Sequence, residues 1–419
     1  MTSTSTTARS GPWPEGPRED VFTVARPGTP NGDGEDRRIW RRSLFLGLSA
    51  LVVSRVCMLI GAGVRASQQS VDADRLLQPR PGSPFALVAR VFAQWDSNWY
   101  LEIVRNGYPR SIPPDVTYFQ LEARAAFFPL YPHLVRWFDA IVPAGDTFAA
   151  LLLNVIAAVA AVVLVGLLAR RLYGAEVAGR TMVLFAIFPG SFVLSFAYAE
   201  ALLIVLAAAC LLFLHDERWL LAGAAAALAT ATRPNGIALV AACIVASAIA
   251  IHRRRDWWSL VAVVLSPLGF LGFQWFLAAH TGESTAWWRV QSEAWREGTS
   301  FGITAVSNTL SFLRHPLASP ADALTFACMI TLGFGLWCLW KRRLPWPMVA
   351  YCAVIIALML LPATVTARPR FLLTAFPLFI SVAAWWPRND RTAWDLMLVL
   401  SGAGLTGLTA LYGVYGAIP

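Results

Sequence analysis

The residues of this sequence best suited to chemistry are ionisable side chains at the edges of apolar stretches. Asp96 lies between tryptophans in FAQWDSNWYLEIVRNGYP (92–109), and Glu200 interrupts the apolar stretch FPGSFVLSFAYAEALL (188–203), with Tyr198 beside it. A carboxylate in such a place can act as a general base. However, the helix dipole alone explains an acid at a helix N-terminus, and a hairpin would leave Glu200 merely solvated. For each of the two acids, a chemical role and a purely structural explanation are both open.

Arginines occupy comparable positions. Arg233 and Asn235 lie in the predicted turn ATRPNGIAL, and Arg368 and Arg370 lie in TARPRFLL. Arginine suits the bidentate binding of phosphate oxygens. Arg55 lies inside the first apolar run and therefore needs a partner, for which Glu200 or a lipid phosphate would serve.

The segment FFPLYPHLVR contains two prolines three residues apart, around Tyr131 and just before His133. Proline is favoured where a helix begins, so the segment predicts a rigid turn followed by a helix. Tyr131 and His133 are candidates to contact a phosphate or a sugar. The alternative is a loop that only connects two membrane spans.

The spacing of aromatic residues around Asp96 predicts a helix. Phe92, Trp95, Trp99 and Ile103 recur on one helical face, and Gly107 supplies a stop. Such an aromatic stripe suits a helix that lies in the membrane interface, with Asp96 held at its edge.

The composition indicates the kind of protein that positions these residues. Of 419 residues, 57% are hydrophobic and 14% are charged, with a mean hydropathy of +0.55. Soluble proteins carry about 25% charged residues, so a polytopic membrane protein is predicted. The net charge of +9 resides in short arginine clusters between apolar runs, which argues against nucleic-acid binding. The six cysteines lie in apolar segments without the spacing of a disulfide framework or metal site.

The apolar runs predict the topology. Residues 1–38 are expected to form a disordered cytoplasmic tail, and residues 39–419 a single all-α transmembrane domain. About eleven spans are predicted, at 44–64, 148–169, 179–196, 199–214, 219–232, 236–251, 257–279, 321–340, 346–362, 371–387 and 393–415. The arginine clusters agree with a cytoplasmic N-terminus, which leaves two long segments outside, 65–147 and 280–320.

The predicted outer face therefore gathers ionisable residues from separate segments, whereas the inner face holds ordinary basic anchors. The residues concerned are Asp96, His133, Glu200, Arg233, Arg368 and Arg370. This asymmetry predicts an outward-facing site for an anionic, lipid-linked substrate.

In order and spacing, the motifs WDSNWYLEIVRNGYP, FFPLYP, FPGSFVLSFAYAE, TRPNG and, more weakly, WWRVQSEAW resemble the PIG-V family of mannosyltransferases, which have the GT-C fold. The match spans about residues 92–295, with a thinner continuation in RPRFLLTAFPL. Two motifs depart from the family pattern: Pro234 precedes Asn235 where members often have Ser-Asn-Gly, and Ala199 replaces the serine of Tyr-Ser-Glu. Lys341 is the only lysine, so arginine replaces lysine almost completely. This bias suggests a GC-rich bacterial genome, and a bacterial member of the family is therefore indicated.

The resemblance implies a GT-C-like enzyme that transfers mannose from polyprenyl-phosphate-mannose to an extracytoplasmic glycan or glycolipid, with inversion. It makes Asp96 the candidate general base. It requires no metal or other cofactor, because no sugar nucleotide diphosphate takes part. The candidate substrate-binding residues are Trp95, Tyr131, His133, Tyr198, Glu200, Arg233, Asn235, Gln291, Arg368 and Arg370.

Two other interpretations remain open. Short, broken spans with charged turns also occur in transporters and lipid flippases, which place ionisable groups near the membrane midplane between structural repeats. The protein could also be a non-catalytic subunit of a glycosylation complex. A transporter would gather its ionisable groups near the membrane midplane, whereas the predicted transferase gathers them at the outer face.

Overall fold

The computed structural model describes residues 32–78, 82–142, 144–387 and 390–415. The regular elements in these ranges are helices, and Thr299 and Pro362 form an isolated antiparallel bridge. A helix satisfies its own backbone hydrogen bonds, which is why apolar runs rich in alanine and leucine adopt it where water is excluded. The predicted all-α class is confirmed.

Six helical stretches are long and apolar enough to cross a membrane. Four of them lie in single helices: Gly34–Arg75 within α1 (Gly32–Arg75), α5 (Asp146–Tyr173), α14 (Pro320–Lys341) and α18 (Arg391–Gly413). The stretch Pro234–Arg254 consists of η3 (Pro234–Ile237) and α9 (Ala238–Arg254). The stretch Trp257–Thr281 consists of η4 (Trp257–Ser259), α10 (Leu260–Leu265) and α11 (Leu268–Thr281). The chain is therefore a multi-pass membrane protein, as predicted.

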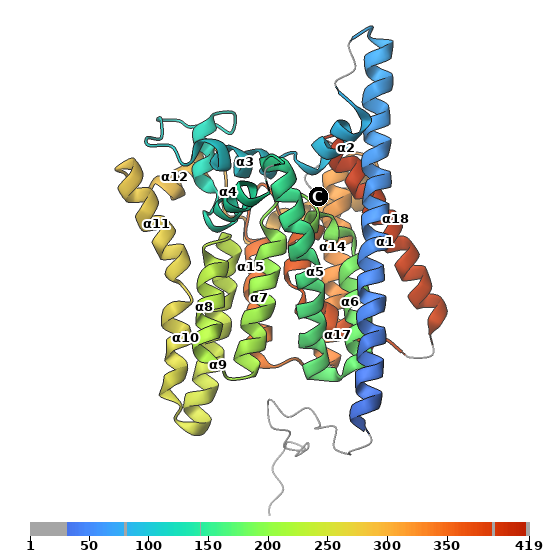
Figure 1. Ribbon diagram of the computed structural model, residues 1–419, viewed down its shortest axis with the longest axis vertical. Helices are drawn as coiled ribbons and strands as arrows, with labels where there is room; N and C mark the ends of the chain where they lie inside the picture. Colours follow the sequence, from blue (N-terminus) through green and yellow to red (C-terminus); the bar gives the residue numbers. More distant parts are fainter. Residues whose placement is uncertain (1–31, 79–81, 143, 388–389, 416–419) are drawn as a thin grey trace, which may run out of the picture.

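The other five predicted spans correspond to shorter helices in the same bundle (Figure 1). These are α6 (Ala175–Ile187), α7 (Glu200–His215), α8 (Trp219–Thr230), α15 (Trp346–Leu360) and α17 (Pro377–Trp385). At 1.5 Å per residue, each is shorter than the roughly 30 Å of a bilayer core. Two short helices lengthen the path beside α6 and α17, namely η2 (Pro189–Leu194) and α16 (Pro369–Thr374).

These helical stretches run alternately toward one end of the bundle and toward the other, so the bundle has two distinct ends (Figure 1). At one end, here called the basic end, α5, α9 and α14 finish at Tyr173, Arg254 and Lys341. Contacts between turns hold this end together: the Tyr173 hydroxyl donates to the carbonyl of Arg343 (2.7 Å), and Arg171 pairs with Asp216 (3.5 Å). The predicted arginine clusters thus gather at one end of the molecule.

The opposite end, here called the capped end, is covered by short helices from the two predicted external segments (Figure 1). They are α2 (Pro84–Phe92), α3 (Asp96–Asn106), η1 (Leu121–Ala126), α4 (Leu130–Ile141), α12 (Ala286–Glu293) and α13 (Ile303–Arg314). A buried cluster that includes Trp99, Tyr108, Phe128 and Trp287 joins the two segments. The segments therefore fold together as one cap.

The structure corrects the prediction of one continuous helix through residue 106. The chain leaves α2 after Phe92 and begins α3 at Asp96, with Trp95 between them at φ +55°. The predicted aromatic stripe packs against other parts of the protein. Its members Trp99 and Ile103 are 7% and 3% exposed and belong to the buried cluster of the cap. Gly107, at φ +69°, ends α3 as predicted.

The first helix is longer than its apolar core. Residues 32–38, predicted as part of a disordered tail, lie in α1, and α1 continues past residue 64 to Arg75. Residues 1–31 of the predicted tail lie outside the described residues. At 1.5 Å per residue, a helix of 44 residues is about 66 Å long, so α1 extends well beyond a bilayer core (Figure 1). Both extensions contain residues with good helix propensity, such as Glu35, Arg37 and Gln68.

Candidate functional site

Two buried ion pairs lie at the capped end. Arg370 Nη1 lies 3.0 Å from Asp96 Oδ2, and Arg233 Nη1 lies 2.7 Å from Glu200 Oε2. The side chains of Arg370 and Asp96 are 7% and 13% exposed, and those of Arg233 and Glu200 are 14% and 1% exposed. Four of the six ionisable residues predicted to share one face therefore form two pairs away from bulk solvent.

The start of α3 and the residue before it together fix the position of Asp96. It is the first residue of α3, so the helix dipole favours its negative charge. The preceding Trp95 has a positive φ, which is unusual for a bulky side chain, and its indole nitrogen donates to the carbonyl of Tyr412 (3.3 Å). Strain of this kind persists only where surrounding contacts enforce it. The carboxylate is thereby directed toward Arg370.

A directed chain of hydrogen bonds supports the start of α3. The Tyr412 hydroxyl donates to the carbonyl of Gln94 (2.6 Å), so in the 2.8 Å contact between Tyr198 and Tyr412 the proton comes from Tyr198. The Tyr198 oxygen in turn accepts the Asp96 backbone N–H (3.2 Å). Tyr198 was predicted from sequence. Tyr412, in α18, was missed because an isolated tyrosine in an apolar run carries no local signal.

Glu200 begins α7, and Arg233 lies between α8 and η3. The turn is tight, because a Cβ on Gly236 would come within 2.5 Å of the Ala229 backbone, so glycine is required there. The hairpin alternative, in which Glu200 is solvated, is wrong because the side chain is buried against Arg233.

The two ion pairs share a neighbour. Burial raises the pKa of the Tyr100 hydroxyl, on which the charges of Arg233, Glu200, Asp96 and Arg370 all act. Tyr100 is 2% exposed and packs edge-on against Tyr131, with ring centroids 5.0 Å apart. The pairs and the tyrosines thus form one site, here called the paired-charge site.

Arg370 and Arg368 are two residues apart but point to different places. Arg370 lies in α16, with its guanidinium carbon 4.7 Å from the centre of the Phe371 ring. Arg368 instead donates to the carbonyl of Ala321 (2.9 Å) and to the hydroxyl of Thr325 in α14. Arg368 therefore ties α16 to α14, and Arg370 alone reaches the paired-charge site.

Other predicted residues are distributed around the cap. Tyr131 is buried in α4 beside Tyr100, whereas His133 is exposed, and its Nδ1 lies 2.7 Å from the Pro129 carbonyl. Asn235 lies in η3, next to the turn that holds Arg233, and Gln291 lies in α12.

The partner of Arg55 differs from that predicted. Its guanidinium donates to the carbonyl of Ser191 (3.2 Å) and to the hydroxyls of Ser54 and Ser195. Glu200 pairs with Arg233 instead. Arg55 therefore links α1 to the segment around η2.

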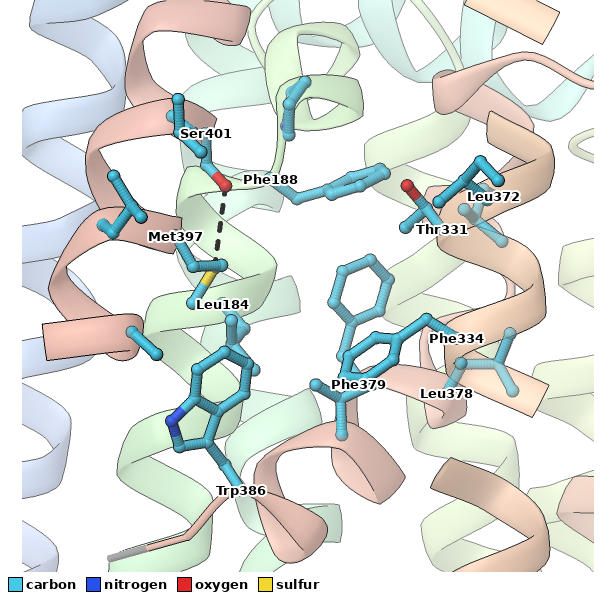
Figure 2. A pocket seen from close by; sticks show the side chains of 17 residues that line it. Leu184, Phe188, Thr331, Phe334, Leu372, Leu378, Phe379, Trp386, Met397 and Ser401 are labelled. Atoms are coloured by element: carbon cyan, nitrogen blue, oxygen red, sulfur yellow. Dashed lines mark hydrogen bonds between the residues drawn. The ribbon is translucent and has the colours of Figure 1, made fainter. Parts of the chain in front are cut away.

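An apolar cavity of about 500 Å³ lies between α6, α14, α17 and α18 (Figure 2). Leu372, two residues after Arg370, contributes to one wall, together with Phe188 and Phe379. Thr331 and Ser401 are the hydroxyl-bearing residues in its lining. Its chemistry suits a hydrocarbon chain.

Within the described residues, no three His, Cys, Asp or Glu side chains are grouped so that they could hold a metal ion. The charges of the paired-charge site are balanced by arginines.

Comparisons with known proteins add the following. A family model described as dolichyl-phosphate-mannose-protein mannosyltransferase matches residues 126–278, a range that includes Glu200 and Arg233 but neither Asp96 nor Arg370. No curated protein matches the sequence significantly. The PIG-V resemblance stays a prediction.

Solved structures that are similar to this chain include the following two. ArnT from Cupriavidus metallidurans bound to undecaprenyl phosphate has 15% identity and a TM-score of 0.45, over 78% of this chain and 76% of that one. The archaeal oligosaccharyltransferase AglB from Archaeoglobus fulgidus, in complex with an inhibitory peptide and a dolichol-phosphate, has 14% identity and a TM-score of 0.45, over 89% of this chain and 56% of that one.

Proposed function

We propose that the protein is a GT-C-type membrane glycosyltransferase that transfers a mannosyl residue from polyprenyl-phosphate-mannose to an extracytoplasmic glycan or glycolipid. The observation that carries the proposal is the pair of buried carboxylate–arginine contacts around Tyr100. The ordered sequence motifs and the family model over residues 126–278 support the same class of reaction.

Asp96 acts as the general base in this proposal. It accepts the proton of the acceptor hydroxyl as that oxygen attacks the anomeric carbon. The bond between the anomeric carbon and the phosphate oxygen breaks, and the electron pair leaves with polyprenyl phosphate. A single displacement with one base inverts the anomeric configuration.

The arginines stabilise the leaving group. Guanidinium groups in a water-poor site interact strongly with a phosphate whose negative charge grows in the transition state. Arg370 and Arg233 are poised for this role because both are nearly buried and are held by carboxylates. When the donor phosphate engages Arg370, Asp96 is released from its counter-ion and its carboxylate becomes available as a base.

The apolar cavity supplies a place for the polyprenyl chain. Its lining includes Leu372, on the short helix that carries Arg370 (Figure 2), and we propose that the polyprenyl chain lies here while the phosphate contacts Arg370. A volume of about 500 Å³ is within the usual range for small-molecule ligand pockets, roughly 300–1,000 Å³, and is enough for part of a polyprenyl chain.

The remaining predicted residues are proposed to support substrate binding around this centre. Tyr131 and Tyr198 are closest to it through Tyr100 and Asp96. Trp95, His133 and Gln291 are proposed to act from the cap and Asn235 from η3, whereas Arg368 is proposed to act indirectly, by holding α16 against α14.

The experiment that tests the function supplies the donor directly. Membranes containing the protein are incubated with radiolabelled polyprenyl-phosphate-mannose, and the labelled product is extracted and identified. Polyprenyl-phosphate-glucose serves as the matched donor control. We expect transfer from the mannose donor only. Equal transfer from the glucose donor would contradict the sugar assignment, and no transfer from either donor would favour the transporter or scaffold alternatives.

The side of the membrane is tested separately. Ser111 belongs to the cap and His252 to the basic end, and both are exposed. In a Cys57→Ser background, whose other cysteines are buried, Ser111→Cys should react with an impermeant thiol reagent from outside. His252→Cys should react only after permeabilisation. The reverse pattern would put the site on the cytoplasmic side.

A further inference from the structure

A second cavity lies at the capped end and has a different chemistry from the paired-charge site. It has a volume of about 300 Å³ and lies between the end of α3, the start of α4 and the end of α11. Its polar lining consists of Asn106, Arg110, His133, Arg136 and His280. The cavity thus collects two arginines and two histidines from three segments.

No acid contributes to this lining. Arg110 and Arg136 are exposed, and neither forms an ion pair with an acid among the described residues. Two acids lie near: Glu102 accepts a hydrogen bond from Asn106 (2.7 Å), and Asp139 lies three residues beyond Arg136 on α4. The two guanidinium groups remain available for an external anion.

The two imidazoles are fixed in place. His133 Nδ1 lies 2.7 Å from the Pro129 carbonyl, so this nitrogen donates and Nε2 is left for another contact. His280 stacks on Phe276, with ring centroids 5.3 Å apart, and its Nε2 approaches the carbonyl of Tyr108 at 3.4 Å. The cavity therefore has ordered walls.

Its position is that of a lipid headgroup. His280 is the penultimate residue of the candidate span Trp257–Thr281, so the cavity lies where this span leaves the hydrocarbon. The helices that line it carry large exposed apolar side chains: Trp137 and Ile141 on α4 are 67% and 76% exposed, and Trp275 on α11 is 76% exposed. Exposed tryptophans at the end of a span are typical of the membrane interface.

We propose that this cavity binds the anionic headgroup of a membrane lipid, with the phosphate at Arg110 and Arg136 and the acyl chains along Trp137 and Trp275. A free phosphate would satisfy the arginines but would leave the neighbouring apolar surface without a partner. The arginines that carry the inference, Arg110 and Arg136, have no role in the proposed reaction, and the inference therefore does not depend on it, although His133 is also proposed to support substrate binding.

Lipid binding by the full chain tests the inference. Purified protein in detergent is titrated with fluorescent phosphatidylglycerol, and phosphatidylcholine is the zwitterionic control. Arg110→Gln/Arg136→Gln should weaken phosphatidylglycerol binding by about tenfold or more, since each basic residue near an anionic surface contributes about one factor of five. The weak binding of phosphatidylcholine should not change.

The matched control is Arg75→Gln/Arg314→Gln, which removes two exposed arginines that lie outside this cavity. It should bind phosphatidylglycerol like the wild type. Equal affinity in the cavity variant and this control would overturn the proposal.

If inorganic phosphate at millimolar concentration displaces the lipid fully, the site is a free-anion site and the lipid assignment is wrong. Should the arginine variant fail to fold, His133→Ala/His280→Ala gives a second test, and unchanged binding by that folded variant would also contradict the inference.

Discussion

The two ends of the bundle contain the same kinds of charged residues but use them differently. At the basic end, Arg254 pairs with Glu217 and Arg171 with Asp216, and the arginine side chains are 53% and 59% exposed. At the capped end, the arginines that pair with Asp96 and Glu200 are 7% and 14% exposed. The ion pairs of the basic end lie in water, whereas the capped end has exposed pairs such as Arg105–Asp146 and, in addition, two pairs that are removed from water.

This difference has an energetic meaning. Exposed ion pairs contribute about 0–1 kcal/mol, and basic side chains at the membrane surface need no partner. Burying an ion pair costs desolvation that the attraction between its charges only partly offsets, and apolar residues often serve stability equally well. The buried pairs are therefore better explained by chemistry than by stability.

The largest effect is expected for Asp96→Asn. This change keeps the shape of the side chain and removes the proton acceptor, so the rate of sugar transfer should fall by about 10²–10⁴-fold. Asp216→Asn, at the basic end, should leave the rate unchanged. Because Asp96→Asn also leaves the buried Arg370 without its counter-ion, transfer is measured with labelled donor at a temperature well below the thermal unfolding of the variant. A rate within a few fold of wild type would leave Asp96 with a structural role only, and Glu200 would become the candidate base.

Glu200→Gln should have the largest effect on stability. It leaves the Arg233 guanidinium nearly buried without its counter-ion, which costs about 3–5 kcal/mol in the free energy of unfolding. Glu217→Gln removes the equivalent acid from the exposed pair and should cost at most about 1 kcal/mol. Denaturant unfolding in detergent measures both. Similar losses in the two variants would remove the contrast between the ends.

Arg370→Lys tests the phosphate contact. Lysine keeps the charge but cannot make a bidentate contact with phosphate. Transition-state binding should weaken by about 1.5–3 kcal/mol, measured as a decrease in kcat/KM for the polyprenyl-phosphate donor. Arg254→Lys is the control at the basic end. Wild-type kinetics for Arg370→Lys would rule out a bidentate role for this arginine.

The smallest of these effects is expected for Tyr412→Phe. The variant loses the hydroxyl that links Tyr198 to the Gln94 carbonyl, which should cost about 0.5–1.5 kcal/mol. We expect kcat to fall by a few fold while the KM for the donor is unchanged, because the hydroxyl supports Asp96 without contacting substrate. Tyr173→Phe, which removes a hydroxyl bond at the basic end, should leave kcat unaltered. Equal behaviour of the two variants would exclude a positioning role for Tyr412.

Much of the helical framework could be predicted from local sequence. All eleven apolar runs are helical, because backbone groups away from water must pair within their own segment. Gly107 and the prolines before His133 mark helix boundaries as expected, since their conformational limits are properties of single residues. The ends of α1 were misjudged, because hydropathy reports the membrane core and not the helix that continues past it.

The candidate site was predictable as a set of residues but not as an arrangement. An isolated acid or arginine in an apolar context is costly, so the sequence singled out Asp96, Glu200, Arg233 and Arg370, together with His133 and Arg368, which the structure places outside the paired-charge site. It could not pair them, because Asp96 and Arg370 are 274 positions apart and meet only when α16 packs beneath the cap. Local pattern also failed to separate Arg368 from Arg370, whose side chains diverge onto different helices.

The sequence by itself determined that this is a helical membrane protein with its chemistry-bearing residues near the ends of its spans, because hydropathy and charge act on each segment separately. Only the tertiary structure decided that α2 and α3 break at Trp95, that Tyr412 supports the start of α3, and that the charges meet as two buried pairs. These features depend on contacts between segments far apart in the chain, and such contacts leave no periodicity in either segment.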